Sequence, residues 1–208
     1  MTKRKFNKTK LNSVGVFCGS SDGKNKIFRE AAMVLGKKLA ENNIRLVYGG
    51  GSLGLMGTVS NSVYSSGGNV LGVIPKKLLM VEGINNKLDE VIITDDMHSR
   101  KMTMYKNSQA FICLPGGVGT LEEILEVVTW SQLNISRKPI LILNLCGYWD
   151  KLNNLIRHVI SEGFAKPELL ELFSVHNQVN SLISALVTSL RIESKEYKPS
   201  AIQINKKE

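Results

Sequence analysis

The sequence predicts an α/β fold, in which a doubly wound parallel sheet is covered by helices on both faces. Short apolar runs alternate regularly with amphipathic segments along the 208 residues, as βαβ units require. The apolar runs lack polar alternation, which is typical of strands that are buried on both sides. A chain of this length forms one sizeable core rather than two, so a single domain is expected.

The first strand is expected in SVGVFC (13–18), a mostly apolar run. KIFREAAMVLGKKLAEN (26–42) follows with helical periodicity, because its apolar residues recur every three to four positions. IRLVYGG (44–50) predicts a second strand that ends in glycines. LGLMGTVSNSVYSSGG (53–68) predicts a helix that a glycine pair terminates.

The middle of the chain continues the same alternation. NVLGVIP (69–75) predicts a third strand, which Pro75 ends. A polar loop is expected over about residues 76–89. A short strand in EVIITDD (90–96) and a helix in HSRKMTMYKNS (98–108) are expected to follow.

The last part of the chain repeats the pattern. QAFICLP (109–115) predicts a strand, and a helix is expected from about 119 to 134. KPILILNL (138–145) predicts another strand, and YWDKLNNLIRHVISEG (148–163) predicts a helix that its terminal glycine closes. A final helix is expected over 177–191. This succession of strands and helices predicts a Rossmann-like architecture.

The catalytic or binding domain is expected to cover residues 13–191, between a basic, flexible N-terminal segment (1–12) and a loose C-terminal tail (192–208). Residues 1–10 carry five basic side chains and no acidic one, so much of the net charge of +9 lies outside the folded body. A nucleic-acid partner is therefore not expected. No apolar run approaches the roughly 20 residues that span a membrane, and the N-terminus lacks the apolar segment of a signal peptide. A cytoplasmic location is expected.

The cysteines and histidines give no sign of a metal site. Cys18, Cys113 and Cys146 lie far apart, each at or near the end of an apolar run, and no CxxC pattern occurs. Reduced, buried thiols are the expected state, in keeping with a reducing compartment. The three histidines have no metal-ligand spacing, so no metal is expected.

Three expected strands lead into glycine-rich turns: CGSSDG (18–23), YGGGSLGLMG (48–57) and LPGGVGTLEE (114–123). The carboxyl ends of parallel strands meet at one edge of the sheet, where doubly wound folds bind ligands. Glycine allows backbone amides to approach an oxyanion, and helix N-termini favour negative charge. One such turn is often only a tight connection, but three at the same edge predict a phosphate-bearing ligand.

A dinucleotide is not the ligand that this pattern favours. Gly49, Gly51 and Gly54 match GxGxxG, but dinucleotide-binding folds also place an acidic residue at the end of the next strand. Pro75 and Lys76 stand at that point here, which argues against a nicotinamide cofactor. The pattern GxxxxGK[ST] is also absent, which argues against a P-loop nucleotidase.

Two acidic residues follow the third glycine turn and permit two interpretations. Thr120 and Glu123 have the spacing of a capping box, in which each side chain accepts a hydrogen bond from a free amide of the first helical turn. That interpretation does not account for the three nearby glycines or for the adjacent Glu122. Glu122, Glu126 and Thr129 recur at helical spacing and face either a pocket or water.

Arg100 and Lys101 also permit two interpretations. Both are expected early in a helix, where cations oppose the helix dipole and gain nothing from local structure. They are either ordinary surface charges or binding groups for an anionic ligand.

Four motifs resemble the LOG family of cytokinin riboside 5′-monophosphate phosphoribohydrolases: VFCGSSDG (16–23), YGGGSLGLMG (48–57), DMHSRK (96–101) and PGGVGTLEE (115–123). The resemblance extends from about residue 13 to 190. It implies hydrolysis of the N-glycosidic bond of a cytokinin or related purine nucleoside 5′-monophosphate, such as AMP, with release of the base and ribose 5-phosphate. Many members carry an older lysine decarboxylase label, but no lysine here is placed as a pyridoxal phosphate anchor, so no cofactor is expected.

The resemblance also implies roles for individual residues. Glu123, with Arg100 as its partner, stabilises positive charge on the ribose and activates water, while Glu122 holds the ribose hydroxyls. The sequence by itself does not decide which of the two glutamates performs the chemistry. The expected substrate-binding residues are Ser20, Gly50, Gly51, Glu82, Arg100, Lys101, Gly116, Gly117, Val118, Gly119, Thr120, Leu121, Glu122 and Thr129. The loop that holds Glu82 differs from the family's usual Pro-containing version, which affects the expected base selectivity more than catalysis.

A second function class remains open: a carrier that binds a nucleotide or cofactor through the same glycine turns without hydrolysing it. The acidic pair favours the enzyme, because extra carboxylates beside a phosphate weaken simple binding. A nucleic-acid-binding module is the third alternative, and steep salt dependence of binding would be its sign. The resemblance further implies a homodimer.

Overall fold

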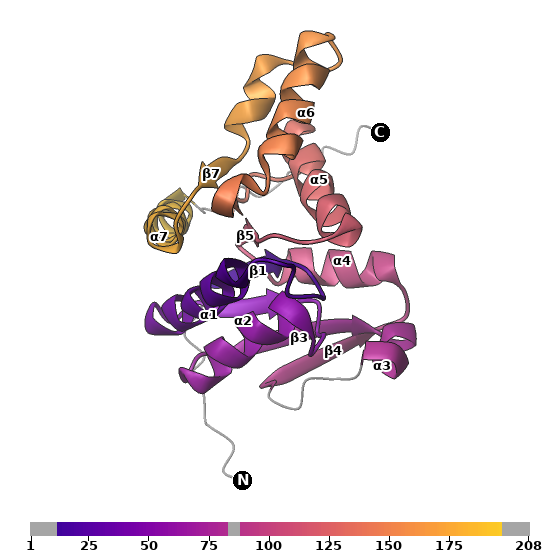
Figure 1. Ribbon diagram of the computed structural model, residues 1–208, viewed down its shortest axis with the longest axis vertical. Coiled ribbons are helices and arrows are strands. Elements are labelled where there is room, and N and C mark those ends of the chain that lie inside the picture. Colours follow the sequence, from indigo (N-terminus) through magenta and orange to yellow (C-terminus); the bar gives the residue numbers. More distant parts are fainter. Residues whose placement is uncertain (1–11, 83–87, 197–208) are drawn as a thin grey trace, which may run out of the picture.

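A computed structural model describes residues 12–82 and 88–196 of the chain (Figure 1). Its seven strands form one sheet in the order β4-β3-β2-β1-β5-β6-β7, and every neighbouring pair is parallel. The strands are β1 (Ser13–Phe17), β2 (Arg45–Tyr48), β3 (Val70–Pro75), β4 (Glu90–Thr94), β5 (Ala110–Cys113), β6 (Ile140–Leu143) and β7 (Ser174–His176). The helices are α1 (Lys26–Glu41), α2 (Gly54–Ser65), α3 (Lys76–Glu82), α4 (Met97–Lys106), α5 (Val118–Gln132), α6 (Asp150–Ser161) and α7 (Val179–Glu196), with the 3-10 turns η1 (Leu145–Gly147) and η2 (Pro167–Glu171). The predicted doubly wound, Rossmann-like fold is confirmed.

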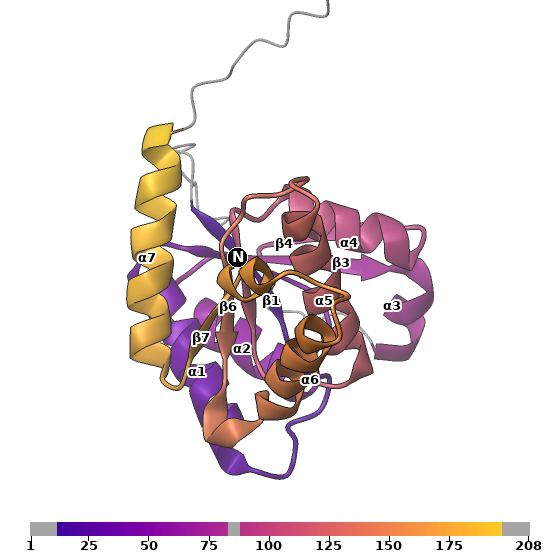
Figure 2. The same cartoon turned by 90° about the horizontal axis from the view of Figure 1, so that it is seen from above.

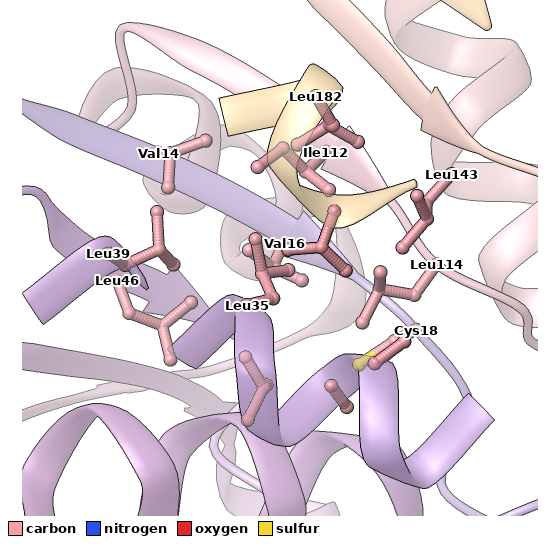
Figure 3. Packing of buried hydrophobic residues seen from close by; sticks show 14 of the residues in the cluster. Val14, Val16, Cys18, Leu35, Leu39, Leu46, Ile112, Leu114, Leu143 and Leu182 are labelled. Carbon is pink, nitrogen blue, oxygen red and sulfur yellow. The ribbon is translucent and has the colours of Figure 1, made fainter. Parts of the chain in front are cut away.

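Successive strand residues enter two separate cores, one on each face of the sheet. On one face, Val14 and Val16 of β1 pack with Leu35 of α1 and Leu182 of α7 (Figure 3). On the other face, Phe17 joins a cluster that contains residues of α4, α5 and α6. Figure 2 shows α1, α2 and α7 on one side of the sheet and α4, α5 and α6 on the other. Because both faces are covered, the central strands are apolar without alternation, as predicted.

The direction of winding changes between β1 and β5. The chain first adds β2, β3 and β4 to one side of β1, and α4 then returns it to place β5 on the other side. The turns after β1 and β5 therefore leave neighbouring strands at the same edge. Doubly wound sheets bind their ligands at this switch point, and two of the three glycine-rich turns meet there.

Several elements differ from the prediction. Residues 76–82 form α3 instead of a polar loop, because Leu78 and Leu79 are half-buried. The strand β7 was not predicted, because its three residues lie at the sheet edge and form no apolar run. Helix α5 begins at Val118 rather than 119, and α7 extends to Glu196 rather than 191.

The predicted terminal segments lie almost wholly outside the described residues. Of the segment 1–12, only Asn12 is described, and of the tail 192–208, only 192–196, which belong to α7. Within the described ranges, none of the helices has both the length and the apolar composition needed to cross a bilayer.

Candidate active site

The three glycine-rich turns are bonded to one another at the carboxyl edge of the sheet. The amide of Gly19 donates to the carbonyl of Pro115 (3.1 Å), and the carbonyl of Gly19 accepts from the amide of Met56 (3.2 Å). Gly54 adopts a positive φ of 58°, and a Cβ there would lie 2.3 Å from the backbone carbon of Ser20. Only glycine permits both this conformation and this close approach, so the glycines bring the turns together.

A cavity of about 280 Å³ opens where these turns meet α4 and α5. Its walls combine backbone, charged side chains and two methionines. They are formed by Cys18, Gly19, Ser20, Met56, Met97, Arg100, Gly117, Val118, Gly119, Thr120, Glu122 and Glu123. Val118 is 83% exposed and Met97 is 45% exposed, so these two side chains form an apolar rim.

Arg100 is a buried residue of this site and not a surface charge. Asp96 caps α4 by accepting a hydrogen bond from the amide of Ser99 (2.7 Å), which fixes the first turn that carries Arg100. The Arg100 side chain then passes into the protein, where Nε donates to the carbonyl of Val73 (3.2 Å) and Nη2 donates to that of Gly49 (3.5 Å). The residue is only 8% exposed. The surface-charge interpretation is therefore wrong for Arg100.

Glu123 faces Arg100 across the cavity wall. Nη2 of Arg100 and Oε1 of Glu123 lie 3.9 Å apart, and their side chains are 9% and 12% exposed. Burial raises the pKa of Glu123 to about 7, although the charge of Arg100 opposes that rise. Glu123 can therefore both accept and release a proton near neutral pH.

Lys101 binds two further carboxylates of α5. Its ammonium donates to Glu122 and to Glu126, the latter at 3.0 Å. Burial by itself lowers the pKa of Lys101, but the hydrogen bonds to both glutamates outweigh it and raise the pKa above its ordinary value. Lys101 is therefore paired with two carboxylates of its own chain, and its predicted contact with a ligand stays a prediction. Its charge is directed to α5, and it does not line the cavity.

The capping-box interpretation of Thr120 and Glu123 is wrong. Helix α5 begins at Val118, its N-cap is Gly117, and no side chain caps it. Thr120 therefore lies inside the first turn, where it is 3% exposed and packs so closely on Gly116 that a Cβ there would lie 2.1 Å from Oγ1. Tertiary packing decides the conformation at this point, and it leaves the Glu123 carboxylate available to the cavity.

Gly117 and Gly119 have no packing reason to be glycine. A Cβ at either position would meet no atom within 4 Å, and neither residue has a positive φ. Both line the cavity beside the first amides of α5, which have no partner within the helix. Such an open, glycine-lined helix N-terminus can receive an anion.

The other predicted residues divide between the cavity and its surroundings. Seven of the expected substrate-binding residues line it: Ser20, Arg100, Gly117, Val118, Gly119, Thr120 and Glu122. Six lie outside its walls: Gly50, Gly51, Lys101, Gly116, Leu121 and Thr129. Gly50 instead makes the turn after β2 with a φ of 82°, and Thr129 donates to the Leu125 carbonyl of its own helix. Glu82 belongs to α3, but its side chain lies outside the described residues.

Four cavity residues were not predicted: Cys18, Gly19, Met56 and Met97. Cys18, Gly19 and Met56 lie within the glycine-rich motifs, so their position beside the other motif residues was the available signal. Burial, with a smaller contribution from Glu123, raises the pKa of Cys18 far above its ordinary value, so its thiol is not a ready nucleophile. Among the described residues, no group of three or more potential metal-binding side chains occurs.

The family model and the related sequences that match this chain agree on one family. The family described as "Possible lysine decarboxylase" matches residues 56–186. The cytokinin riboside 5′-monophosphate phosphoribohydrolase LOG3 of Arabidopsis thaliana is 47% identical over 86% of this chain and 83% of its own length. LOG7 of the same plant is 44% identical over 96% and 88%, and the probable enzyme LOGL2 of Oryza sativa subsp. japonica is 48% identical over 86% and 73%.

Solved structures share the fold at low sequence identity. The molybdenum cofactor binding protein of Rippkaea orientalis has a TM-score of 0.68 and 20% identity, and the match covers 87% of this chain and 98% of that one. The molybdenum cofactor carrier protein of Chlamydomonas reinhardtii has a TM-score of 0.64 and 20% identity, with 88% and 99% covered. At such identity these matches concern the fold alone.

Proposed function

The chain belongs to the LOG family of cytokinin riboside 5′-monophosphate phosphoribohydrolases, and from this membership we propose how its residues act. The enzyme is a hydrolase of the N-glycosidic bond of a cytokinin or related purine nucleoside 5′-monophosphate. Water adds to C1′ of the ribose as the bond from C1′ to the base nitrogen breaks. The products are the free base, which takes up a proton, and ribose 5-phosphate.

The 5′-phosphate binds at the N-terminus of α5. The open space beside Gly117 and Gly119 and the free amides of the first turn support this assignment. Side chains at these two positions would occupy space on the cavity wall, which accounts for the glycines that packing leaves unexplained. The apolar rim formed by Met97 and Val118 offers a surface for the base.

Glu123 is the proposed catalytic residue. Departure of the base gives the ribose oxocarbenium character, and a buried carboxylate stabilises that positive charge more strongly than one in water. With a pKa of about 7, Glu123 can also accept a proton from the attacking water. The single observation that carries the proposal is the Arg100–Glu123 pair, buried in the wall of a cavity that also contains the phosphate-binding turn.

Arg100 and Glu122 have supporting roles. Arg100 lowers the pKa of Glu123 relative to burial alone and thereby keeps a share of the carboxylate ionised at neutral pH. Glu122, which lines the cavity and binds Lys101, is placed to accept hydrogen bonds from the ribose hydroxyls. Lys101 has a raised pKa and two carboxylate partners, so it does not supply the neutral amine that a Schiff base requires.

A substitution of Glu123 tests the proposal. AMP and an isopentenyl analogue are incubated with the enzyme, and ribose 5-phosphate is followed by chromatography. Glu123→Gln should reduce base release at least 100-fold while nucleotide binding remains measurable, because general acid–base groups typically contribute 10²–10⁴-fold. Glu162→Gln, at the C-cap glutamate that follows α6 and whose side chain is 59% exposed, is the matched control and should keep wild-type turnover. Near-normal turnover of Glu123→Gln would refute the assigned role.

The carrier alternative makes a different prediction in the same assay. A nucleotide or cofactor carrier would bind AMP without releasing ribose 5-phosphate. The buried Glu123 disfavours a carrier, since an ionised carboxylate beside the phosphate site weakens anion binding.

A homodimer and a cytoplasmic location are also proposed on the family resemblance. Leu125 of α5 is 41% exposed, and Leu133 and Ile135, which follow the helix, are 62% and 64% exposed, which offers apolar surface for a second copy. Light scattering of the purified protein tests the dimer, and a mass of one chain would contradict it.

A further inference from the structure

The hydroxyl of Tyr148 reaches the phosphate-binding turn from outside the active-site cavity. It donates to the carbonyl of Gly116 at 2.6 Å, across 32 positions of sequence. Tyr148 lines a second cavity of about 160 Å³ together with Gly116 and Gly117, and it is not among the residues of the active-site cavity. The hydroxyl therefore contacts the turn from a neighbouring cavity, which shares Gly19 and Gly117 with the active-site cavity.

The contact fixes the orientation of one peptide group. The carbonyl of Gly116 and the amide N–H of Gly117 belong to the same planar trans peptide and point in opposite directions. Because the carbonyl is directed to Tyr148, the N–H of Gly117 is directed away from it. Rotation of this peptide meets little steric resistance, since both flanking residues are glycine. A reversed peptide would present a carbonyl oxygen to an incoming phosphate, and the two would repel each other.

Tyr148 is itself held in place by the connection between β6 and α6. Asn144 accepts a hydrogen bond from the amide of Trp149 (2.7 Å) and donates to the carboxylate of Asp150 (2.7 Å). The Tyr148 ring packs edge-on against Phe28 of α1 and against Trp149, with centroid distances of 5.4 and 4.9 Å. The hydroxyl is therefore presented to the turn by a fixed framework.

Two further contacts hold the other residues of the turn. The carbonyl of Pro115 accepts from the amide of Gly19 (3.1 Å). The Cα of Gly116 lies against Thr120, where a Cβ would come within 2.1 Å of the hydroxyl. The peptide between Gly116 and Gly117 is thus the part of the turn that depends on Tyr148.

We infer that Tyr148 is a positioning residue, which holds the Gly116–Gly117 peptide in the orientation that binds the substrate phosphate. This inference rests on the proposed binding of the 5′-phosphate at the N-terminus of α5. It predicts an effect on phosphate binding and little effect on the chemical step, because the hydroxyl lies outside the active-site cavity.

The test is Tyr148→Phe, which removes the hydroxyl and retains the ring. Binding of ribose 5-phosphate, measured by calorimetry, should weaken about 3- to 10-fold, the range expected for one net hydrogen bond. The KM for AMP should rise by a similar factor, while kcat stays within about twofold. Tyr64→Phe on α2 is the matched control, since Tyr64 is 43% exposed and Tyr148 is 41% exposed, and it should leave both values unchanged.

Binding of adenosine, which lacks the phosphate, separates positioning from a general structural role. Tyr148→Phe should bind adenosine as the wild type does. Unchanged affinity for ribose 5-phosphate would overturn the inference, and so would an equal loss of affinity for adenosine. Ribose 5-phosphate binding needs no turnover. A wild type that binds this ligand and hydrolyses no nucleotide would therefore refute the proposed function, while the Tyr148→Phe effect on binding would still support the positioning role.

Discussion

The guanidinium of Arg100 occupies the space that a side chain at Gly49 would need. A Cβ at Gly49 would lie 1.9 Å from Nη2 of Arg100, and the Gly49 carbonyl accepts a hydrogen bond from the same nitrogen. Gly49 has no positive φ, so backbone conformation does not require glycine at this position. The glycine that follows β2 is therefore needed for the position of Arg100 and, through it, for the ion pair with Glu123.

Gly49→Ala is accordingly expected to displace Arg100 from Glu123. Loss of the nearby positive charge raises the pKa of Glu123 further above about 7, so less of the carboxylate is ionised at neutral pH. In a plot of kcat/KM against pH, the acid limb should move to higher pH, and kcat at pH 7 should fall at least tenfold.

Gly117→Ala is the matched control for this substitution. A Cβ at Gly117 would meet no other residue within 4 Å, so the variant should raise KM through the proposed phosphate site and leave the acid limb at its wild-type pH. An acid limb that stays at its wild-type position in Gly49→Ala, with folding intact by circular dichroism, would show that Gly49 does not position Arg100.

Two charged residues near Glu123 shift its pKa in opposite directions. Glu126 raises the pKa of Glu123, whereas Lys101 lowers it. Glu126→Gln should therefore move the acid limb of kcat/KM to lower pH, and Lys101→Met should move it to higher pH. The shifts should shrink at high salt, because mobile ions screen partly exposed charges. Shifts of the same sign in both variants would contradict this electrostatic account.

Most of the fold could be predicted from local sequence patterns. Six strands were predicted because each is an apolar run bounded by glycine, proline or polar residues, and burial on both faces requires such runs. The strand β7 has no such run, because one of its sides lies at the sheet edge. Its pairing with β6 is a tertiary contact that three residues cannot encode by themselves.

The site could be predicted only in part, because its contacts join elements that lie far apart in the sequence. The glycine turns indicated an anion, but Thr120 and Glu123 matched a capping box equally well. The contact between Thr120 and Gly116, which excludes that box, depends on how the turn after β5 packs. The pairing of Lys101 with Glu126 depends on the crossover that brings α4 beside α5, so Glu126 could not be assigned from spacing.

Thiol reactivity should differ sharply among the three cysteines. Cys18 and Cys113 are buried and Cys146 is exposed, and burial raises the pKa of both buried thiols. Iodoacetamide at pH 8 should therefore alkylate Cys146 alone in the native protein, and all three after unfolding in urea. Mass spectrometry of tryptic peptides measures this. An adduct on Cys18 in the native enzyme would show that the active-site cavity does not protect its thiol.

Glu123 should make the enzyme less stable as pH rises, because its carboxyl is buried. Its pKa is raised from 4.5 to about 7 on folding, so the protonated form is favoured in the folded state. That stability is fully present below about pH 4.5 and is lost as pH rises through about 7. One pKa unit corresponds to about 1.4 kcal/mol, so ionisation costs about 3 kcal/mol of unfolding free energy.

Glu123→Gln cannot ionise, so its free energy of unfolding should not fall in this way as pH rises. In urea unfolding, its free energy of unfolding should be close to that of the wild type at pH 4.5 and higher by about 3 kcal/mol at pH 8. Glu162→Gln should show no such pH-dependent gain, because that side chain is 59% exposed. A side chain that lowers stability at neutral pH is expected where it is kept for chemistry rather than for folding, which is the role proposed for Glu123. Equal pH dependence of the wild type and Glu123→Gln would mean that Glu123 titrates at its ordinary pKa and does not carry the proton proposed for it.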